Sequence, residues 1–242
     1  MFRAVRLNKA SLEIISQIRE LIFAGKLQPG DRLAPENSLL EQFGVSKQTL
    51  KEALRTLEYM GLLEIKKGVS GGAYVVEMDR EVIREVLATF LFFKNPTIHN
   101  ISEVRKVIEP YTARIAAEKA TEKDLERISG FIFVYNNQIE NYEIEDMKND
   151  IEFHRGIAEL TGNPILELIV DFIETIMVDL KKLIKPNLSF SDKVTKAHQR
   201  IFKALKEKDP DKASNEMLIH LIEVEESLAV MEEKIGLWKG LK

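Results

Sequence analysis

Three histidines and one aspartate in the second half of the chain have the residue types and spacing of a metal site. Asp150 and His154 are four residues apart, so on a helix their side chains lie one above the other on the same face. His198 and His220 fall in two further segments with helical periodicity, and the four side chains could converge inside a bundle. Imidazole favours zinc, nickel, iron or copper, and the carboxylate supplies neutralising charge. The competing interpretation is that these residues form ordinary hydrogen bonds on helix surfaces.

A second charged pair has the same four-residue spacing. Arg105 and Glu109 could stabilise the surface of a helix, or Arg105 could face the bundle interior beside the metal, with Glu109 orienting it. A guanidinium and a metal ion both bind anionic oxygens, so together they would bind a carboxylate. Asn163 begins another helical segment, where asparagine is more often a cap than a ligand, and we keep it as a candidate effector contact.

The segment from Val45 to Leu63 has a different polar pattern. Leu50, Ala53 and Leu57 recur at helical spacing, and Ser46 precedes them as an expected cap. The polar face opens with four hydrogen-bonding or basic side chains: Lys47, Gln48, Thr49 and Lys51. A helix with this pattern suits insertion into the major groove of DNA, with its N-terminus first.

Short elements around this helix predict a winged helix-turn-helix over residues 1–77. Periodicity predicts helices at 8–25, 36–43 and 47–60, followed by strands at 62–65 and 73–76. The strands are joined by a basic, glycine-rich loop whose backbone can approach phosphates closely: Lys66, Lys67, Gly68 and Gly71.

The remainder, residues 78–242, predicts an antiparallel bundle of about seven helices, so the fold class is mainly α. Helical periodicity continues to the end of the chain, with proline-containing breaks and short connections. The expected helices lie near 80–93, 101–119, 122–140, 144–161, 164–184, 191–208 and 211–235.

Composition limits the possible functions. The 242 residues include no cysteine, which excludes disulfides and cysteine-ligated metals. No apolar run reaches about 18 residues, so we expect a cytoplasmic protein without a membrane span. Residues 1–75 contain eleven Lys or Arg and eight Asp or Glu, a net charge of +3, whereas the rest has a net charge of −7. A basic head on an acidic body fits a nucleic-acid-binding module joined to a different kind of domain.

The first third of the chain resembles the DNA-binding domain of the GntR family of bacterial transcription regulators. The matching motifs are Pro29–Leu33, Phe43–Ser46, Leu50–Leu54 and Gly61–Leu63, followed by the glycine-rich loop. The resemblance implies DNA contacts by the polar residues already named and by Arg32, Asn37 and Ser46. Relatives usually have arginine where Asn37, Lys47 and Lys51 stand here. Lysine cannot form the bidentate contact that arginine makes with guanine, so the base preference of relatives does not carry over.

The second part resembles the effector-binding FCD domain of the FadR-like branch of this family. The resemblance rests on Arg105–Pro110, Asp150–His154, Gly162–Pro164, Lys196–His198 and His220–Leu221. Family members with this aspartate and three histidines bind a divalent metal, so the resemblance implies a metal site here, with zinc or nickel expected. It also favours Arg105 as an effector contact. Some relatives bind a fatty acyl thioester, but an intact metal set makes the cavity polar and argues against that ligand.

The leading hypothesis is a ligand-controlled transcription regulator rather than an enzyme. A homodimer would bind a pseudo-palindromic operator, and a small organic acid at the metal and Arg105 would modulate that binding. One alternative is a metal-responsive repressor, in which the ion itself is the signal. Another is a metal-dependent hydrolase or isomerase, but the chain has no His-Glu-x-x-His motif, and using the three matched histidines as ligands leaves no obvious general base.

Overall fold

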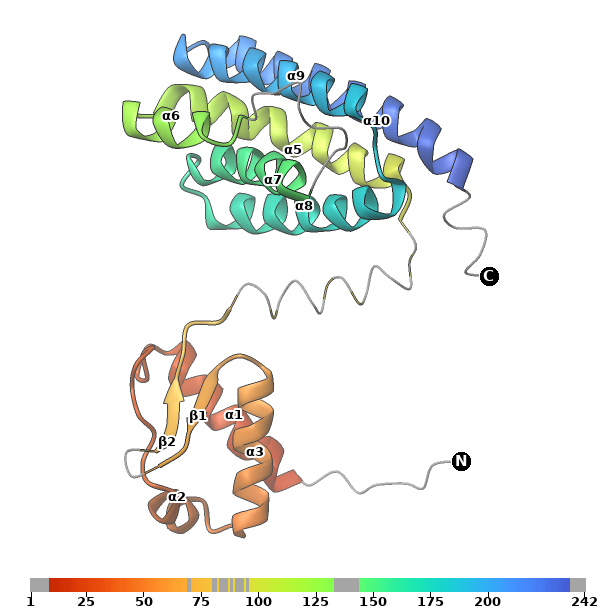
Figure 1. Cartoon of the computed structure of the whole chain (residues 1–242). Helices are drawn as coiled ribbons and strands as arrows, with labels where there is room; N and C mark the ends of the chain where they lie inside the picture. The colour runs from red at the N-terminus through yellow and green to blue at the C-terminus, as the bar shows by residue number, and fades with distance from the viewer. Residues whose placement is uncertain are drawn as a thin grey trace. The chain divides into compact units, whose positions relative to one another are not determined.

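The chain folds into two compact units, residues 1–86 and 87–242. The computed structural model describes residues 9–68, 71–79, 96–132 and 144–235, together with residues 82, 87, 89 and 94. Figure 1 shows a small first unit that contains a hairpin and a larger second unit whose described elements are all helices. The domain boundary expected after residue 77 stays a prediction.

The first unit is a winged helix-turn-helix. It contains α1 (Lys9–Phe23), α2 (Glu36–Phe43), α3 (Lys47–Tyr59), β1 (Leu63–Lys66) and β2 (Gly72–Val75). The two strands pair antiparallel, from Leu63 opposite Val75 to Lys66 opposite Gly72. The predicted order of three helices and a hairpin is therefore confirmed.

Local chemistry sets the ends of α3 and its packing. The Ser46 side chain accepts a hydrogen bond from the Thr49 backbone N–H at 3.2 Å, which caps the first turn. Gly44 ends α2 with φ 62°, a left-handed conformation that favours glycine. Leu50, Ala53 and Leu57 are fully buried and pack with α1 and the strands into one core. This packing leaves the opposite face of α3 at the surface.

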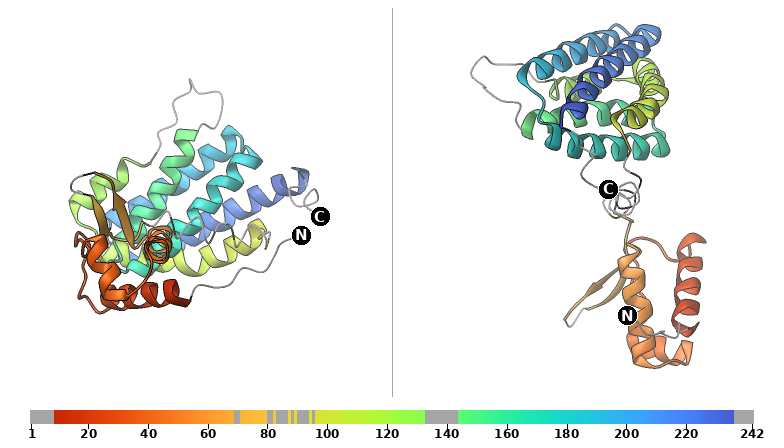
Figure 2. Two further views of the ribbon diagram at one scale, coloured as in Figure 1. Left: turned by 90° about the horizontal axis from the view of Figure 1, so that it is seen from below. Right: turned by 90° about the vertical axis from the view of Figure 1, so that its right-hand side faces the viewer.

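The second unit is a helical bundle. Its described helices are α5 (Ile98–Lys119), α6 (Glu122–Ser129), α7 (Ile144–Glu159), α8 (Pro164–Ile184), α9 (Leu188–Lys206) and α10 (Pro210–Ile235). Figure 2 shows these helices lying side by side. α5 and α10 run antiparallel, because Lys106 pairs with Glu225 whereas Arg114 pairs with Asp211.

Two predicted helices of the bundle have different ends in the structure, and a third lies mostly outside the described residues. The prediction for 122–140 is too long, because α6 ends at Ser129 and the chain turns at Gly130, where the Phe131 N–H bonds to the Ile128 carbonyl. Residues 133–143 lie outside the described residues, as does most of the helix predicted at 80–93. α5 begins before the predicted residue 101, because Thr97 and Asn100 form a reciprocal cap.

Two apolar clusters hold the bundle together. One joins α5, α6, α7, α9 and α10, and the other joins α5, α8, α9 and α10. Charged and imidazole side chains are buried on five of these helices as well. Within the described residues, none of the helices combines the length and apolar character that crossing a bilayer requires.

Candidate functional site

The four candidate metal ligands converge inside the bundle. Asp150 and His154 come from α7, His198 from α9 and His220 from α10, and none is more than 5% exposed. Each offers a ligand atom, and these atoms all lie within 4.8 Å of one another. The alternative in which these residues lie on helix surfaces is therefore wrong.

The spacing of the ligand atoms fits a small divalent ion. Nε2 of His154 lies 3.3 Å from Nε2 of His220, and Nε2 of His198 lies 3.4 Å from Oδ1 of Asp150. Two donor atoms bound to a tetrahedral zinc ion at about 2.0–2.1 Å lie roughly 3.3–3.4 Å apart. Nε2 of His198 and Oδ1 of Asp150 are buried and have no hydrogen-bond partner among the described residues. An ion between them would satisfy both atoms.

Burial keeps two of the imidazoles in the form that binds metals. It lowers the pKa of His198 to about 3, against the attraction of Asp150, and it lowers the pKa of His220 well below its usual value. Both rings are therefore neutral at neutral pH. Burial acts to raise the pKa of Asp150, but the Lys181 ammonium and the neighbouring histidines together outweigh it, so the net shift is downward and the carboxylate is ionised.

Glu109 lies behind His154 and connects it to Arg105. Its Oε2 is 2.5 Å from Nδ1 of His154, an ion contact without hydrogen-bond geometry, and its Oε1 accepts a hydrogen bond from Nε of Arg105 at 2.5 Å. Burial opposes ionisation of Glu109, but the charges of Arg105 and His154 hold its pKa at about 2. A carboxylate at Nδ1 favours the tautomer that leaves Nε2 free for a metal.

Arg105 is also inside the bundle, so its interpretation as part of a surface pair is wrong. Its side chain is 2% exposed, and its Nη2 lies 3.4 Å from Nε2 of His154. The same nitrogen is 2.7 Å from Oε1 of Glu174 on α8. The guanidinium therefore borders the ligand atoms and already carries two carboxylate neighbours.

Sequence reasoning missed two buried charged residues, Glu174 and Lys181 of α8. Glu174 is fully buried, and Nζ of Lys181 contacts Oδ2 of Asp150. Burial raises the pKa of Glu174, although Arg105 partly offsets this effect. The available signal was that both lie on the apolar stripe of α8, near Val170 and Met177.

Asn163 lies outside this cluster. It is exposed at the start of α8, where its Oδ1 accepts a hydrogen bond from the Ile165 N–H at 3.0 Å. This geometry is that of a helix cap. His99, to which the sequence assigned no function, is exposed and pairs with Glu225 at 2.7 Å.

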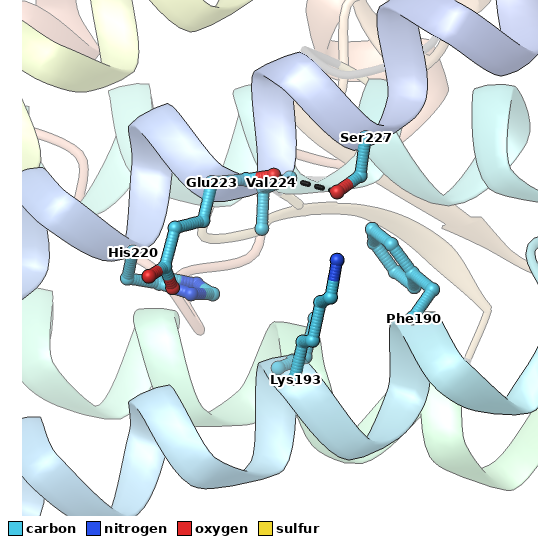
Figure 3. A pocket seen from close by; sticks show the side chains of 7 residues that line it. Phe190, Lys193, His220, Glu223, Val224 and Ser227 are labelled. Carbon is cyan, nitrogen blue, oxygen red and sulfur yellow. Dashed lines mark hydrogen bonds between the residues drawn. The ribbon is translucent and has the colours of Figure 1, made fainter.

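A small cavity between α9 and α10 has His220 in its wall. Figure 3 shows the His220 ring and the Lys193 side chain pointing toward this space. Lys193 and Glu223 also line a larger depression of about 220 Å³. Its wall is mainly charged and includes Lys196, Arg200 and Glu226.

The candidate DNA-binding side chains of the helix-turn-helix lie on its surface. Asn37, Gln48 and Lys51 are exposed, as are Ser46 and Lys47, whereas Thr49 is half-buried. Lys47 forms an exposed ion pair with Glu36 at 3.0 Å. Sequence reasoning did not single out Arg55, which is exposed one turn beyond Lys51 on the same face of α3.

The candidate residues of the wing gather around β2. The Arg32 guanidinium donates a hydrogen bond to the Gly71 carbonyl, and its Cζ lies 5.9 Å from the Tyr74 ring centre. Lys66 contacts the same ring from 5.0 Å. Lys67 and Gly68 are exposed at the end of the hairpin. Arg32, which precedes the hairpin in sequence, therefore stabilises it through contacts with Gly71 and Tyr74.

Two family models match the chain in the two units. Residues 10–75 match the model of bacterial regulatory proteins of the gntR family, and residues 100–223 match the FCD domain. The chain therefore belongs to the GntR family and carries an FCD domain. It is a ligand-responsive transcription regulator, in which the helix-turn-helix binds DNA and the FCD domain binds the effector.

Relatives with this organisation come from several bacteria. The HTH-type transcriptional regulator LutR of Bacillus subtilis is 32% identical over 86% of this chain and 96% of its own length. The galactonate operon transcriptional repressor of Escherichia coli is 28% identical, over 88% of this chain and 93% of its own. A solved structure, Streptococcus agalactiae GntR, shares the fold with a TM-score of 0.63 at 23% identity, covering 90% of this chain and 99% of that one.

Proposed function

We propose that the FCD domain binds a divalent metal ion through Asp150, His154, His198 and His220, and a small organic acid beside it through Arg105. The observation that carries the proposal is the convergence of four buried ligand atoms, with the Arg105 guanidinium 3.4 Å from one of them. Three imidazoles and one carboxylate suit zinc or nickel. The bound ion would act as a Lewis acid toward an anionic oxygen.

The chain's own residues would orient this acid. Arg105 can bind a carboxylate with two parallel N–H donors, but its Nη2 is already close to Glu174. An incoming carboxylate must therefore share the guanidinium with Glu174 or displace it. The name of the Escherichia coli relative refers to galactonate, a carboxylate, which supports this effector class.

The same residues indicate how effector binding would change the arrangement of the helices in the bundle. The ligands come from α7, α9 and α10, whereas Arg105 comes from α5 and Glu174 from α8. An acid that binds one arrangement of these helices more tightly shifts the population toward it, and DNA affinity changes by the same coupling free energy.

On DNA, we propose that a homodimer binds a pseudo-palindromic operator in the cytoplasm. One short recognition helix reads few base pairs, so two copies give useful specificity. Gln48, Lys51 and Arg55 would enter the major groove. Lys66 and Lys67 would contact phosphates.

The test begins with operator sequences selected from a random DNA pool by the purified protein. Affinity for a selected sequence is then measured with zinc-loaded and chelator-treated protein, across a panel of small carboxylates. At least one acid should change the affinity of the zinc-loaded protein. Asp150→Asn should remove this response but retain DNA binding, and a response that survives in Asp150→Asn would overturn the proposal.

A second candidate function is that the metal alone is the signal. The observation favouring it is that two distances between candidate ligand atoms match those around a tetrahedral ion, and four protein ligands would fill all its positions. The same assay without any acid separates the two candidates. A metal-responsive regulator changes its DNA affinity on zinc loading alone.

A further inference from the structure

The contact between Lys181 and Asp150 is unusual for a metal site. Lys181 is among the largest fully buried side chains of the described residues, with 2% of its side chain exposed. It projects from α8 in line with apolar residues and ends at Oδ2 of Asp150. Its Nζ also lies 5.9 Å from the Phe190 ring centre.

A buried ammonium is costly unless a partner compensates its charge. Asp150 is the anion that Lys181 contacts, and its other oxygen, Oδ1, lies 3.4 Å from Nε2 of His198. The carboxylate therefore has one oxygen on the lysine and one directed at the imidazoles. A cation and the candidate ion position share a single aspartate.

We propose that, when no metal is bound, the Lys181 ammonium supplies the positive charge that neutralises Asp150 in place of the metal ion. The inference rests on the proposed metal site and identifies Lys181 as a cation that competes with the metal ion for Asp150. In metal-free protein the ammonium neutralises the buried carboxylate and keeps the bundle folded. A divalent ion must then bind against the positive charge of Lys181, so the lysine weakens metal binding and makes the ion exchangeable.

The metal-free and metal-bound states differ in the charge that an incoming anion meets. A divalent ion adds two positive charges to a site in which Arg105 and Lys181 are already paired with the carboxylates of Glu109, Glu174 and Asp150. A bound anion lowers the resulting repulsion, so metal and anion strengthen each other's binding. The positive charge of Lys181 therefore makes metal binding depend on whether an anion is bound.

Three substitutions in the full chain test the proposal. Lys181→Met removes the charge and keeps the apolar stem, and Lys181→Arg keeps the charge. Lys182→Met is the matched control, because Lys182 is the next residue, exposed, and paired with Asp179 at 3.0 Å. Zinc affinity is measured by competition with a chromophoric chelator, and stability by urea unfolding with and without zinc.

Lys181→Met should bind zinc at least about tenfold more tightly than wild type, because the charge opposing the ion is gone. Without zinc, its urea midpoint should fall, and zinc should restore it. If this variant folds only when zinc is present, that result supports the proposal as well. The zinc affinity of Lys181→Arg should stay within about threefold of wild type, and that of Lys182→Met should equal wild type.

Zinc binding by Lys181→Met that is unchanged or weaker overturns the proposal, as does a variant that fails to fold even with zinc. Failure of the metal site itself looks different. In that case wild type and Asp150→Asn bind zinc equally poorly, whatever residue stands at position 181.

Discussion

Replacing Glu109 with glutamine removes one charge from the centre of the buried network and preserves the shape of the side chain. The Glu109 carboxylate contacts Nδ1 of His154 and Nε of Arg105, both at 2.5 Å. Glutamine can still accept one hydrogen bond, from Arg105. It cannot supply negative charge to the imidazole.

The expected size follows from the pKa of Glu109. Its neighbours hold the pKa at about 2, compared with 4.5 for an unperturbed glutamate. A difference of about 2.5 units corresponds to roughly 3 kcal/mol of preference for the ionised form in the folded state. We expect metal-free Glu109→Gln to lose stability of this order. We also expect a 10–100-fold loss of zinc affinity, as for other carboxylates that orient a ligating histidine.

Urea unfolding of chelator-treated protein measures the first effect, and chelator competition measures the second. Glu103→Gln is the matched control, because Glu103 is exposed on the same helix. The reasoning is refuted if Glu109→Gln stays within about 1 kcal/mol of Glu103→Gln and binds zinc equally well.

Three further predictions concern DNA binding, acid stability and local folding. Lys51→Ala and Arg55→Ala should each weaken DNA binding and reduce the slope of log affinity against log salt by about one, as measured by fluorescence anisotropy. Metal-free protein should lose stability as pH falls from about 6.5 to 3. The pKa of His198 is about 3 in the folded protein and about 6.5 in the unfolded chain, so in this pH range only the unfolded chain binds a proton at His198. Glu109, with a folded pKa of about 2, adds to this loss below about pH 4.5, and thermal melts between pH 8 and pH 4 check the sign. Ser46→Ala should destabilise the first unit by about 1 kcal/mol in the same melts, because it removes the cap of α3.

Much of the first unit was predictable because its signals are local. α2 occupies the predicted residues 36–43, and the ends of α3 follow from the Ser46 cap and Gly61. The hairpin strands are shifted by one residue from their predicted positions. Caps, turns and apolar periodicity depend on neighbours in sequence, so they could be read from it.

The site was only partly predictable because helix packing decides it. The sequence shows that Asp150 and His154 share a face, but not which residues of α8 lie opposite them. Glu174 and Lys181 therefore escaped notice, although both interrupt an apolar stripe. The sequence suggested that Glu109 orients Arg105, but it did not show that Glu109 also contacts Nδ1 of His154.

Anomalous diffraction at the zinc edge, from crystals of the zinc-loaded protein, tests the central claim most directly. We expect one strong peak per chain inside the bundle, about 2.0–2.2 Å from Nε2 of His154, His198 and His220 and from Oδ1 of Asp150. Zinc found only at the protein surface, with no anomalous peak between these four side chains, would contradict that claim.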